Sequence, residues 1–304
     1  MKKDILTLLD LTSDDFEQLF NKAIQLKKRY KQGIPDNQLQ GKTVGLLFDK
    51  ASTRTRVSFE AATAHLGGTS MFINAGDTQI SRNEPVKDTA RILSGYLDAL
   101  VIRTYSQAWL EEFAQSSDIP VINALTDSYH PTQVLADLMT VIEHKPDYKN
   151  LKISWVGDGN NMCYSWINAA IVLGLNLSIA SPEKYSPDKG TIKKDFHNKN
   201  TIISYFTDPV EAVKDADVIN TDVWASMGQE NEQKQRVKEL SHYQVNNELL
   251  KHAKNDVIVM HCLPAHRGEE ITDDVLEGSN SVVWDQAENK LHMAKAILEA
   301  LLTG

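Results

Sequence analysis

Hydrophobic and polar residues alternate along the chain in two kinds of segment: short apolar runs, and longer stretches with an apolar residue every three or four positions. The short runs are typical of buried strands and the longer periodic stretches of amphipathic helices. In the first half, the short runs predict strands near residues 43–48, 70–73, 99–102 and 120–123. The periodic stretches predict helices near residues 13–30, 54–66, 85–97, 107–116 and 131–144.

The same alternation resumes after Pro146–Asn150, which we interpret as a connection between domains. The apolar runs there predict strands near residues 152–156, 176–180, 202–206, 217–220, 257–260 and 281–284, and a last helix is expected over 288–302. Strands that alternate with helices favour parallel sheets covered by helices on both faces. Because 304 residues exceed what one core usually serves, the sequence predicts an α/β protein with two parallel-sheet αβα domains.

The segment Ser52-Thr53-Arg54-Thr55-Arg56 lies where the first predicted strand gives way to a helix. Ser52 is a suitable N-cap for that helix. The first N–H groups of a helix and its dipole attract anions, and hydroxyls and two guanidiniums are added to them here. We therefore interpret this turn as a candidate phosphate site, against the alternative of a capped helix with two solvated arginines.

Chemically active residues also follow other predicted strands of the first half. Arg103 comes directly after the strand at 99–102, and His130-Pro131-Thr132-Gln133 lies a few residues after the strand at 120–123. Proline suits the first turn of a helix, which places His130 at the mouth of that helix and Gln133 one turn in. Ligands of α/β proteins bind beyond the carboxyl ends of strands, so these residues are candidates for a site.

The second half repeats this arrangement. Asp222 and Ser226-Met227-Gly228 follow the strand at 217–220, and His261-Cys262-Leu263-Pro264 follows the strand at 257–260. Each of these residues has a simpler explanation taken alone, since a lone histidine is usually a satisfied polar group and a buried cysteine a small hydrophobe. Their recurrence at strand ends favours a ligand site.

Composition restricts the class of protein further. Charged residues make up 24% and hydrophobic residues 41% of the chain, which is ordinary for a soluble globular protein. A net charge of −9 argues against general nucleic-acid binding, so any anion must be held by a local cluster of positive groups. The two cysteines, Cys163 and Cys262, have neither metal-ligand nor disulfide spacing. With no apolar run of membrane-spanning length and no signal-peptide core, we expect a cytoplasmic protein without membrane contact.

A glycine-rich turn, Gly157-Asp158-Gly159-Asn160-Asn161, follows the strand at 152–156 and opens a helix, as a dinucleotide-binding fingerprint does. The third glycine of that fingerprint is absent, and no acidic residue ends the next strand. Nucleotide binding is therefore disfavoured. The same geometry suits a small ligand, with the Asn161 amide presented at a helix start.

Three of these motifs together resemble the aspartate/ornithine carbamoyltransferase family. The family's signatures are similar to residues 52–56, 130–133 and 261–264 in order and in spacing, over essentially the whole chain. The cysteine of the third motif and the segment Asp222–Gly228 resemble the branch that uses ornithine, since a carboxylate and a neutral thiol suit a diamino acid better than a dicarboxylate. The resemblance implies transfer of a carbamoyl group from carbamoyl phosphate to the δ-amine of L-ornithine, which gives L-citrulline and phosphate in arginine metabolism. Whether the role is in arginine biosynthesis or in arginine breakdown stays open.

The resemblance also implies which residues bind each substrate. The phosphate of carbamoyl phosphate would be held by residues 52–55, its carbonyl oxygen polarised by Arg103 and His130, and its amide nitrogen held by Gln133. The set implied for carbamoyl phosphate is Ser52, Thr53, Arg54, Thr55, Gln79, Arg103, His130, Pro131, Thr132, Gln133, Cys262, Leu263 and Lys290. The set implied for ornithine is Asn161, Asp222, Ser226 and Met227. Arg103, His130, Cys262 and Asp222 would be catalytic, and which of the last two helps to deprotonate the amine stays open.

For the architecture, the resemblance implies a carbamoyl phosphate-binding domain over residues 1–147 and an ornithine-binding domain over 148–286, with the active site in the cleft between them. The C-terminal helix, 287–304, would return to the first domain. A homotrimer or a multiple of it is implied, in which Gln79 reaches the site of a neighbouring subunit. Neither a metal nor another cofactor is expected, because two bound substrates and donors for the developing oxyanion suffice for this transfer.

One position departs from the family pattern. The family usually has arginine where this chain has Lys290, and the loss of the planar guanidinium predicts weaker binding of carbamoyl phosphate. The alternative is that Lys290 is a solvated residue at a helix start. Three other functions stay open: a carbamoyltransferase for another amine such as putrescine, a nucleotide-dependent oxidoreductase, and a catalytically silent sensor of ornithine or phosphate.

Overall fold

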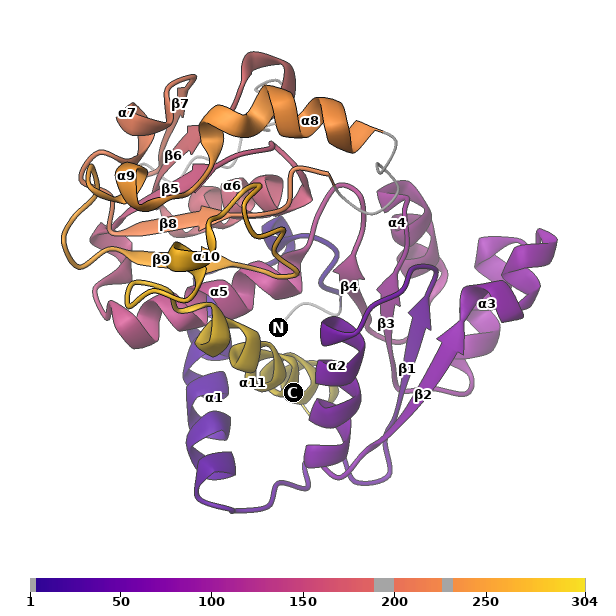
Figure 1. Cartoon of the computed structure of the whole chain (residues 1–304). Helices are drawn as coiled ribbons and strands as arrows, with labels where there is room; N and C mark the ends of the chain where they lie inside the picture. The colour runs from indigo at the N-terminus through magenta and orange to yellow at the C-terminus, as the bar shows by residue number, and fades with distance from the viewer. Residues whose placement is uncertain (1–3, 189–199, 226–231, 304) are drawn as a thin grey trace. The chain divides into compact units, whose positions relative to one another are not determined.

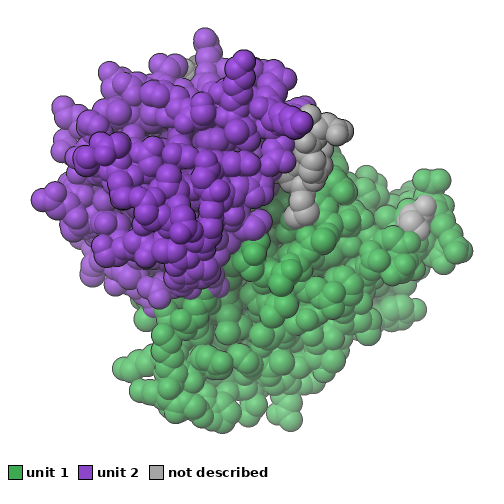
Figure 2. Space-filling model, viewed as in Figure 1, with its two compact units in different colours: residues 1–139, 288–304 green, residues 140–287 purple. Residues whose placement is uncertain are grey.

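The computed structural model describes residues 4–188, 200–225 and 232–303. The chain divides into two units, coloured separately in Figure 2: residues 1–139 with 288–304, and residues 140–287. Each unit is built around one parallel sheet. The predicted α/β class with two parallel-sheet domains is confirmed.

The sheet of the first unit has the strand order β2-β1-β3-β4. Its strands are β1 (Thr43–Phe48), β2 (Thr69–Asn74), β3 (Ala99–Arg103) and β4 (Val121–Leu125). The accompanying helices are α1 (Ser13–Lys31), α2 (Arg54–His65), α3 (Val86–Ser94), α4 (Gln107–Ser116), α5 (Pro131–His144) and α11 (Val283–Leu302). Figure 1 shows α2 on one side of this sheet and α3 and α4 on the other.

The alternation of side chains along β3 separates the face that packs on α4 from the face that carries Arg103. Leu100 and Ile102 pack into a core with Leu110 and Phe113 of α4. Successive side chains of a strand point to opposite faces, so Arg103 belongs to the other face. The last residue of β3 therefore presents its guanidinium away from the α3 and α4 layer.

The C-terminal helix α11 packs in the first unit, as predicted. Lys295 Nζ donates to Asp36 Oδ2 at 2.8 Å, and both side chains are almost fully buried. Lys27 Nζ of α1 donates to Asn289 Oδ1, also at 2.8 Å. Buried charges of this kind are costly unless paired, so these contacts fix the position of α11 against α1 and the loop that comes after α1.

The sheet of the second unit has the strand order β7-β6-β5-β8-β9. Its strands are β5 (Lys152–Val156), β6 (Asn176–Ala180), β7 (Ile202–Phe206), β8 (Val218–Thr221) and β9 (Ile258–His261). Its helices are α6 (Asn161–Leu173), α7 (Pro209–Val213), α8 (Gln233–Leu240), α9 (Asn247–Leu250) and α10 (Asp273–Leu276). In the described ranges, no helix of either unit combines the length and the apolar composition that a membrane crossing needs.

Each sheet reverses its strand order at one place. In the first unit, β1 has β2 on one side and β3 on the other, and in the second unit β5 has β6 on one side and β8 on the other. Connections leave such a pair of strands in opposite directions, so a crevice opens at the carboxyl ends, where α/β proteins bind ligands. The pairs β1/β3 and β5/β8 are therefore the switch points at which a site is expected.

The predicted strand at 281–284 is wrong. Ser281 forms a single bridge to Val259, and α11 begins at Val283, before the predicted start at 288. The apolar run Val282-Val283-Trp284 is as compatible with a helix as with a strand, because short apolar runs carry no period. Trp284 is 56% exposed, so the run is not a buried strand.

Candidate functional site

The turn from β1 to α2 carries the Ser52–Arg56 segment, but Ser52 is not the N-cap that the sequence predicted. The N-cap is Thr53, in a right-handed helical conformation, and no side chain caps the helix. Ser52 Oγ instead accepts a hydrogen bond from Arg103 Nη1 at 3.1 Å. The first N–H groups of α2 consequently have no side-chain cap, which leaves the positive end of the helix dipole open to an anion.

Only one of the two guanidiniums in this segment is placed for the predicted phosphate site. Arg56 Nε donates to Glu60 Oε1 at 2.9 Å, and its guanidinium lies 3.5 Å from the centre of the Phe72 ring. Arg54 is the first residue of α2 and is exposed, and Thr55 beside it is buried. The prediction of two arginines at the phosphate therefore fails for Arg56.

Arg103 ends β3 at the first switch point and is only 7% exposed. Its Nε is buried and has no hydrogen-bond partner in the described part of the chain. Burial, with a contribution from the charge of Arg54, lowers the pKa of Arg103 to about 10. A buried guanidinium beside a second cation stabilises a bound anion or a developing negative charge.

His130, Thr132 and Gln133 lie at the start of α5, which begins at Pro131 as predicted. His130 is buried, and its Nδ1 lies 3.5 Å from Thr132 Oγ1. Burial first, and then the charges of Lys290, Arg103 and Arg54, lower the pKa of His130 well below its usual range. The imidazole is therefore neutral near pH 7, and it can donate one N–H to a ligand oxygen without carrying charge.

Lys290 reaches the same place from α11. It is 6% exposed, and its Nζ donates a hydrogen bond to Gln133 Oε1. Gln133 Nε2 in turn donates to Asp137 Oδ1 at 2.8 Å. The alternative of a solvated residue at a helix start is wrong, because Lys290 is buried and lies two turns inside α11.

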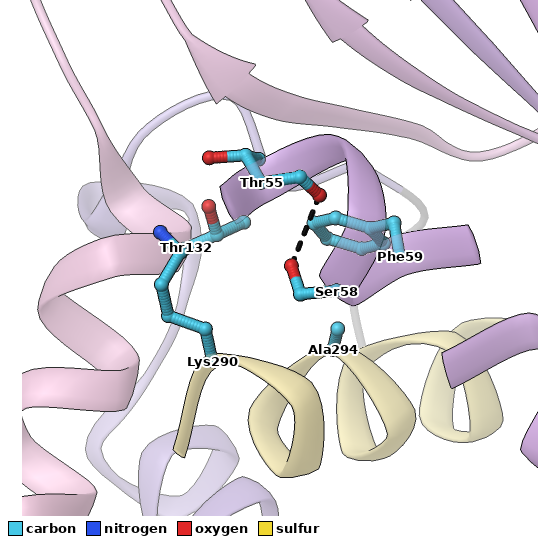
Figure 3. Close-up of a pocket in the computed structure, with 6 residues that line it drawn as sticks. All are labelled: Thr55, Ser58, Phe59, Thr132, Lys290 and Ala294. Atoms are coloured by element: carbon cyan, nitrogen blue, oxygen red, sulfur yellow. Dashed lines mark hydrogen bonds between the residues drawn. The ribbon is translucent and has the colours of Figure 1, made fainter. Parts of the chain in front are cut away.

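A small pocket surrounds the Lys290 side chain (Figure 3). Figure 3 shows the lysine entering from α11 and Thr132 from the start of α5, with α2 opposite. The residues that line the pocket are Thr55, Ser58, Phe59, Thr132, Lys290 and Ala294. Ser58 Oγ donates to the carbonyl oxygen of Thr55 at 2.9 Å, so this hydroxyl is bound within α2.

Gln79, the remaining residue predicted for this half of the site, is exposed. It opens the short 3₁₀ helix η3 (Gln79–Arg82) beyond β2. The structure thus brings Ser52, Arg103, His130, Gln133 and Lys290 into one cluster with α2, and Gln79 lies on the surface.

In the second unit, Asp222 follows β8 at the switch point. Its Oδ1 accepts hydrogen bonds from the Val223 N–H at 2.8 Å and from Cys262 Sγ at 3.0 Å. Its Oδ2 accepts from Asn160 Nδ2 at 2.8 Å. A carboxylate, a thiol and an amide are therefore joined at the carboxyl ends of three neighbouring strands, β5, β8 and β9.

Asn160 is a site residue that the sequence did not predict, since only Asn161 was expected there. Asn160 is the N-cap of α6, and its Oδ1 accepts from the N–H groups of Met162 and Cys163 at 3.0 and 3.2 Å. Asn161 is the first residue of the helix and is partly buried. The preference for asparagine at the N-cap could have indicated the first of the two asparagines.

The glycine-rich turn before Asn160 is fixed by interactions within the chain. The Gly159 N–H donates to the Tyr185 carbonyl at 2.8 Å, and a Cβ at Gly159 would lie 2.5 Å from that oxygen. Trp155 Nε1 donates to the carbonyl of Asp158 at 2.9 Å. The glycine thus permits a close approach of two loops, which explains its presence without a dinucleotide.

Asp158 forms a buried ion pair that was also not predicted. Arg236 Nη1 of α8 lies 3.0 Å from Asp158 Oδ2 and donates to the Trp224 carbonyl at the same distance. Burial raises the pKa of Asp158 to about 6, although the charge of Arg236 acts in the opposite direction. The pair links the turn after β5 to the segment after β8, on either side of Asp222.

The loop after β9 carries Cys262 and Leu263. His261 Nδ1 accepts from the Leu263 N–H at 2.9 Å, and His261 Nε2 lies 2.9 Å from the buried Glu270 Oε1. Because Nδ1 accepts, we assign the proton to Nε2. Leu263 has a left-handed conformation with φ of 58°, which is strained for a residue with a side chain.

Two residues at the end of β9, together with Asp222, could be considered as ligands of a metal ion. Asp222, His261 and Cys262 each have one possible ligand atom within 4.8 Å of the others. Both ring nitrogens of His261 are used in hydrogen bonds, so the group is a poor fit to a metal ion that needs imidazole. Ser226 and Met227, the other residues predicted for ornithine, lie outside the described residues.

Comparison with known families covers both halves of the chain. Residues 3–143 match the model of the aspartate/ornithine carbamoyltransferase carbamoyl-P binding domain. Residues 149–301 match the model of the aspartate/ornithine carbamoyltransferase Asp/Orn binding domain.

Individual relatives agree with these matches. The ornithine carbamoyltransferase of Syntrophus aciditrophicus is 54% identical, over 99% of this chain and 100% of the relative. That of Geobacter sulfurreducens is 51% identical, with the same coverage. Among solved structures, ornithine carbamoyltransferase from Pyrococcus furiosus has a TM-score of 0.94 and 49% identity, over 99% of this chain and 97% of that one. The chain therefore belongs to the aspartate/ornithine carbamoyltransferase family.

Proposed function

We propose that this protein transfers the carbamoyl group of carbamoyl phosphate to the δ-amine of L-ornithine and releases L-citrulline and phosphate. One observation carries the proposal. Basic and amide groups gather at the first switch point and a carboxylate–thiol–amide group at the second, in a chain whose full-length relatives are named ornithine carbamoyltransferases. The relatives give no support to putrescine as the acceptor or to a nucleotide-dependent oxidoreductase.

In the first unit, the start of α2 and Arg54 would hold the phosphate group, together with the hydroxyls of Ser52, Thr53 and Thr55. The lack of a side-chain cap supports this role, because the first N–H groups of α2 then face the ligand. Phosphate leaves as an anion, so the same positive groups also stabilise the leaving group. This half-site accounts for binding and for the departure of phosphate.

The carbonyl oxygen of carbamoyl phosphate would be placed between Arg103 and His130. Attack by an amine moves negative charge onto that oxygen, and preorganised donors in a buried place stabilise the charge. Arg103 offers a fixed cation, and His130 offers a neutral N–H because burial and three nearby cations lower its pKa. Gln133, oriented by Lys290 and Asp137, would hold the amide nitrogen, with Pro131 and Thr132 lining the approach.

In the second unit, Asp222 would pair with an ammonium group of ornithine, and Asn161 would contact the amino acid. Ser226 and Met227 stay predictions from the resemblance. Asp222 and Cys262 share a hydrogen bond, so a proton released by the attacking amine would enter a connected pair. Cys262 and Leu263 would complete the carbamoyl pocket, and no residue of this chain need form a covalent intermediate.

For the assembly we propose a homotrimer or a multiple of it, with Gln79 reaching the site of a neighbouring subunit. Exposed apolar side chains support a self-association surface, since Met71 and Phe72 of β2 are 52% and 40% exposed and Val57 of α2 is 54% exposed. We also propose a cytoplasmic location and a role in arginine biosynthesis. Light scattering of the purified protein tests the trimer, and a monomer at working concentration would contradict it.

The test of function is an assay of carbamoyl transfer with ornithine, putrescine and aspartate offered in parallel, without added metal or nucleotide. We expect citrulline from ornithine and at least about tenfold lower kcat/KM for the other two acceptors. Equal or better use of putrescine would overturn the assignment of the acceptor. Complete loss of activity in a chelator, restored by a divalent cation, would overturn the cofactor-free mechanism.

A further inference from the structure

The outer edge of strand β9 changes its partner just before Cys262. β9 is the last strand of its sheet, so its second side is not paired by another strand of that sheet. At Val259 the segment before α11 pairs with it. The Val259 N–H donates to the Asn280 carbonyl at 2.8 Å, and the Val282 N–H donates to the Val259 carbonyl at 3.0 Å.

The helix start interrupts this pairing. Outward-facing backbone groups of a strand recur every second residue, so the next outward N–H after Val259 is that of His261. The covering segment has by then entered α11, which begins at Val283 and uses its own carbonyl groups. A side chain supplies the missing acceptor, since Gln286 Oε1 receives the His261 N–H at 2.9 Å.

This hydrogen bond is fully enclosed. His261 is 0% exposed and Gln286 is 1% exposed. A buried N–H without its acceptor cannot turn to water, so removal of that acceptor displaces the backbone or destabilises the fold. Gln286 therefore holds the N–H of the last residue of β9.

The position of His261 matters because its neighbour Cys262 belongs to the candidate site. The His261 ring is fixed by Glu270 and by the Leu263 N–H, and Cys262, between His261 and Leu263, donates its Sγ hydrogen to Asp222. The ring can hold this geometry only if the His261 backbone is itself fixed. The His261 N–H donates to Gln286, which is not among the residues predicted to contact either substrate.

We infer that Gln286 is a positioning residue: its side-chain carbonyl fixes His261 and thereby keeps the Cys262 thiol on Asp222. The expected effect on carbamoyl transfer rests on the proposed function, but the effect on the thiol does not. Gln286→Leu removes the acceptor, and Gln286→Glu keeps an oxygen at the same place. Asn280→Ala is the matched control, because Asn280 Nδ2 donates to the Val257 carbonyl at the other end of β9.

The experiment measures alkylation of Cys262 by iodoacetamide, followed by peptide mass spectrometry. Cys163, the second cysteine, is fully buried and its pKa is raised by burial, so it serves as an internal control that stays unmodified in the folded protein. We expect alkylation of Cys262 to become about threefold faster or more in Gln286→Leu, because the thiol leaves the neighbouring carboxylate. Gln286→Glu and Asn280→Ala should keep the wild-type rate.

Kinetics of citrulline formation add the link to function. We expect kcat to fall about tenfold in Gln286→Leu, with recovery in Gln286→Glu. An unchanged alkylation rate in folded Gln286→Leu would overturn the inference, as would an equal acceleration in Asn280→Ala. If Gln286→Leu does not fold, Gln286→Met replaces it under the same criteria. If Gln286→Leu changes the alkylation rate of Cys262 but the wild-type protein forms no citrulline, the proposed function is refuted and the positioning role of Gln286 is retained.

Discussion

The two switch points of this molecule carry groups of opposite charge. At β1/β3 the chain assembles buried cations: Arg103 donates a hydrogen bond to the Ser52 hydroxyl, and Lys290 donates one to the Gln133 amide oxygen. At β5/β8 it assembles a carboxylate whose partners are an amide and a thiol. The first site is therefore prepared for an anion and the second for a cation, which matches a reaction between an acyl phosphate and a diamino acid.

Both sites combine helix starts, at α2 and α5 in the first and at α6 in the second, with contacts between residues far apart in the chain. The second site also has a buried ion pair beside it, Asp158 with Arg236. Substitutions around the second site should therefore act on stability as well as on chemistry.

The largest effect is expected on substitution of Arg103, because it removes the buried guanidinium of the first switch point. Arg103→Ala should lower kcat by about 10²–10³, the usual cost of losing one donor to a developing oxyanion. Steady-state citrulline formation measures this. Arg56→Ala is the control from the neighbouring motif, because Arg56 turns to Glu60 and Phe72. A similar loss of kcat in both variants would mean that fold stability, not charge placement, determines the result.

The buried ion pair of the second unit should make the free energy of unfolding depend on pH. Asp158 has its pKa raised to about 6, above the usual value of 3.8, so the folded protein binds a proton that the unfolded chain has released. Its contribution to stability is therefore fully present below about pH 4 and is lost as the pH rises through about 6, by roughly 1–3 kcal/mol. Urea unfolding of wild type and Asp158→Asn across this range should show the wild type losing stability relative to the variant as pH rises. A constant difference would contradict the assignment.

Asn160 tests whether the second site depends on the residue that the sequence did not predict. Asn160→Ala removes both the α6 cap and the hydrogen bond to Asp222, whereas Asn160→Ser keeps a capping oxygen and removes only the latter. Both variants should lose about tenfold in kcat/KM for ornithine. Only the alanine variant should lose about 1 kcal/mol of stability. Normal ornithine kinetics in Asn160→Ser would remove Asn160 from the site.

The smallest effect is expected at Lys290. Its Nζ already contacts Gln133, and a guanidinium at this place could in addition meet an oxygen anion with two parallel N–H groups. Lys290→Arg should lower the KM for carbamoyl phosphate about fivefold, or about 1 kcal/mol, with little change for ornithine. An unchanged or raised KM would mean that position 290 only orients Gln133.

Of the residues that gather at the two switch points, the sequence indicated more at the first than at the second, for a physical reason. Residues 52–55 and 130–133 are contiguous and come after buried strands, so strand position and residue type together indicate a ligand site. The error there concerned a competition between hydrogen-bond partners, since the Ser52 hydroxyl binds Arg103 instead of capping α2. At the second site, the Asp158–Arg236 pair joins residues 78 positions apart, and the His261–Gln286 hydrogen bond joins residues 25 positions apart. No local pattern carries that information.

The most direct test of the division between the two switch points uses one variant from each. Steady-state KM values for carbamoyl phosphate and for ornithine should be measured in Arg54→Ala and in Asp222→Ala. Removal of one charge-assisted hydrogen bond from either half costs about 1.5–3 kcal/mol, or about ten- to a hundredfold in affinity. We expect Arg54→Ala to raise the KM for carbamoyl phosphate by that factor and Asp222→Ala to do so for ornithine, each with little change for the other substrate. The same defect toward both substrates in both variants would contradict the division.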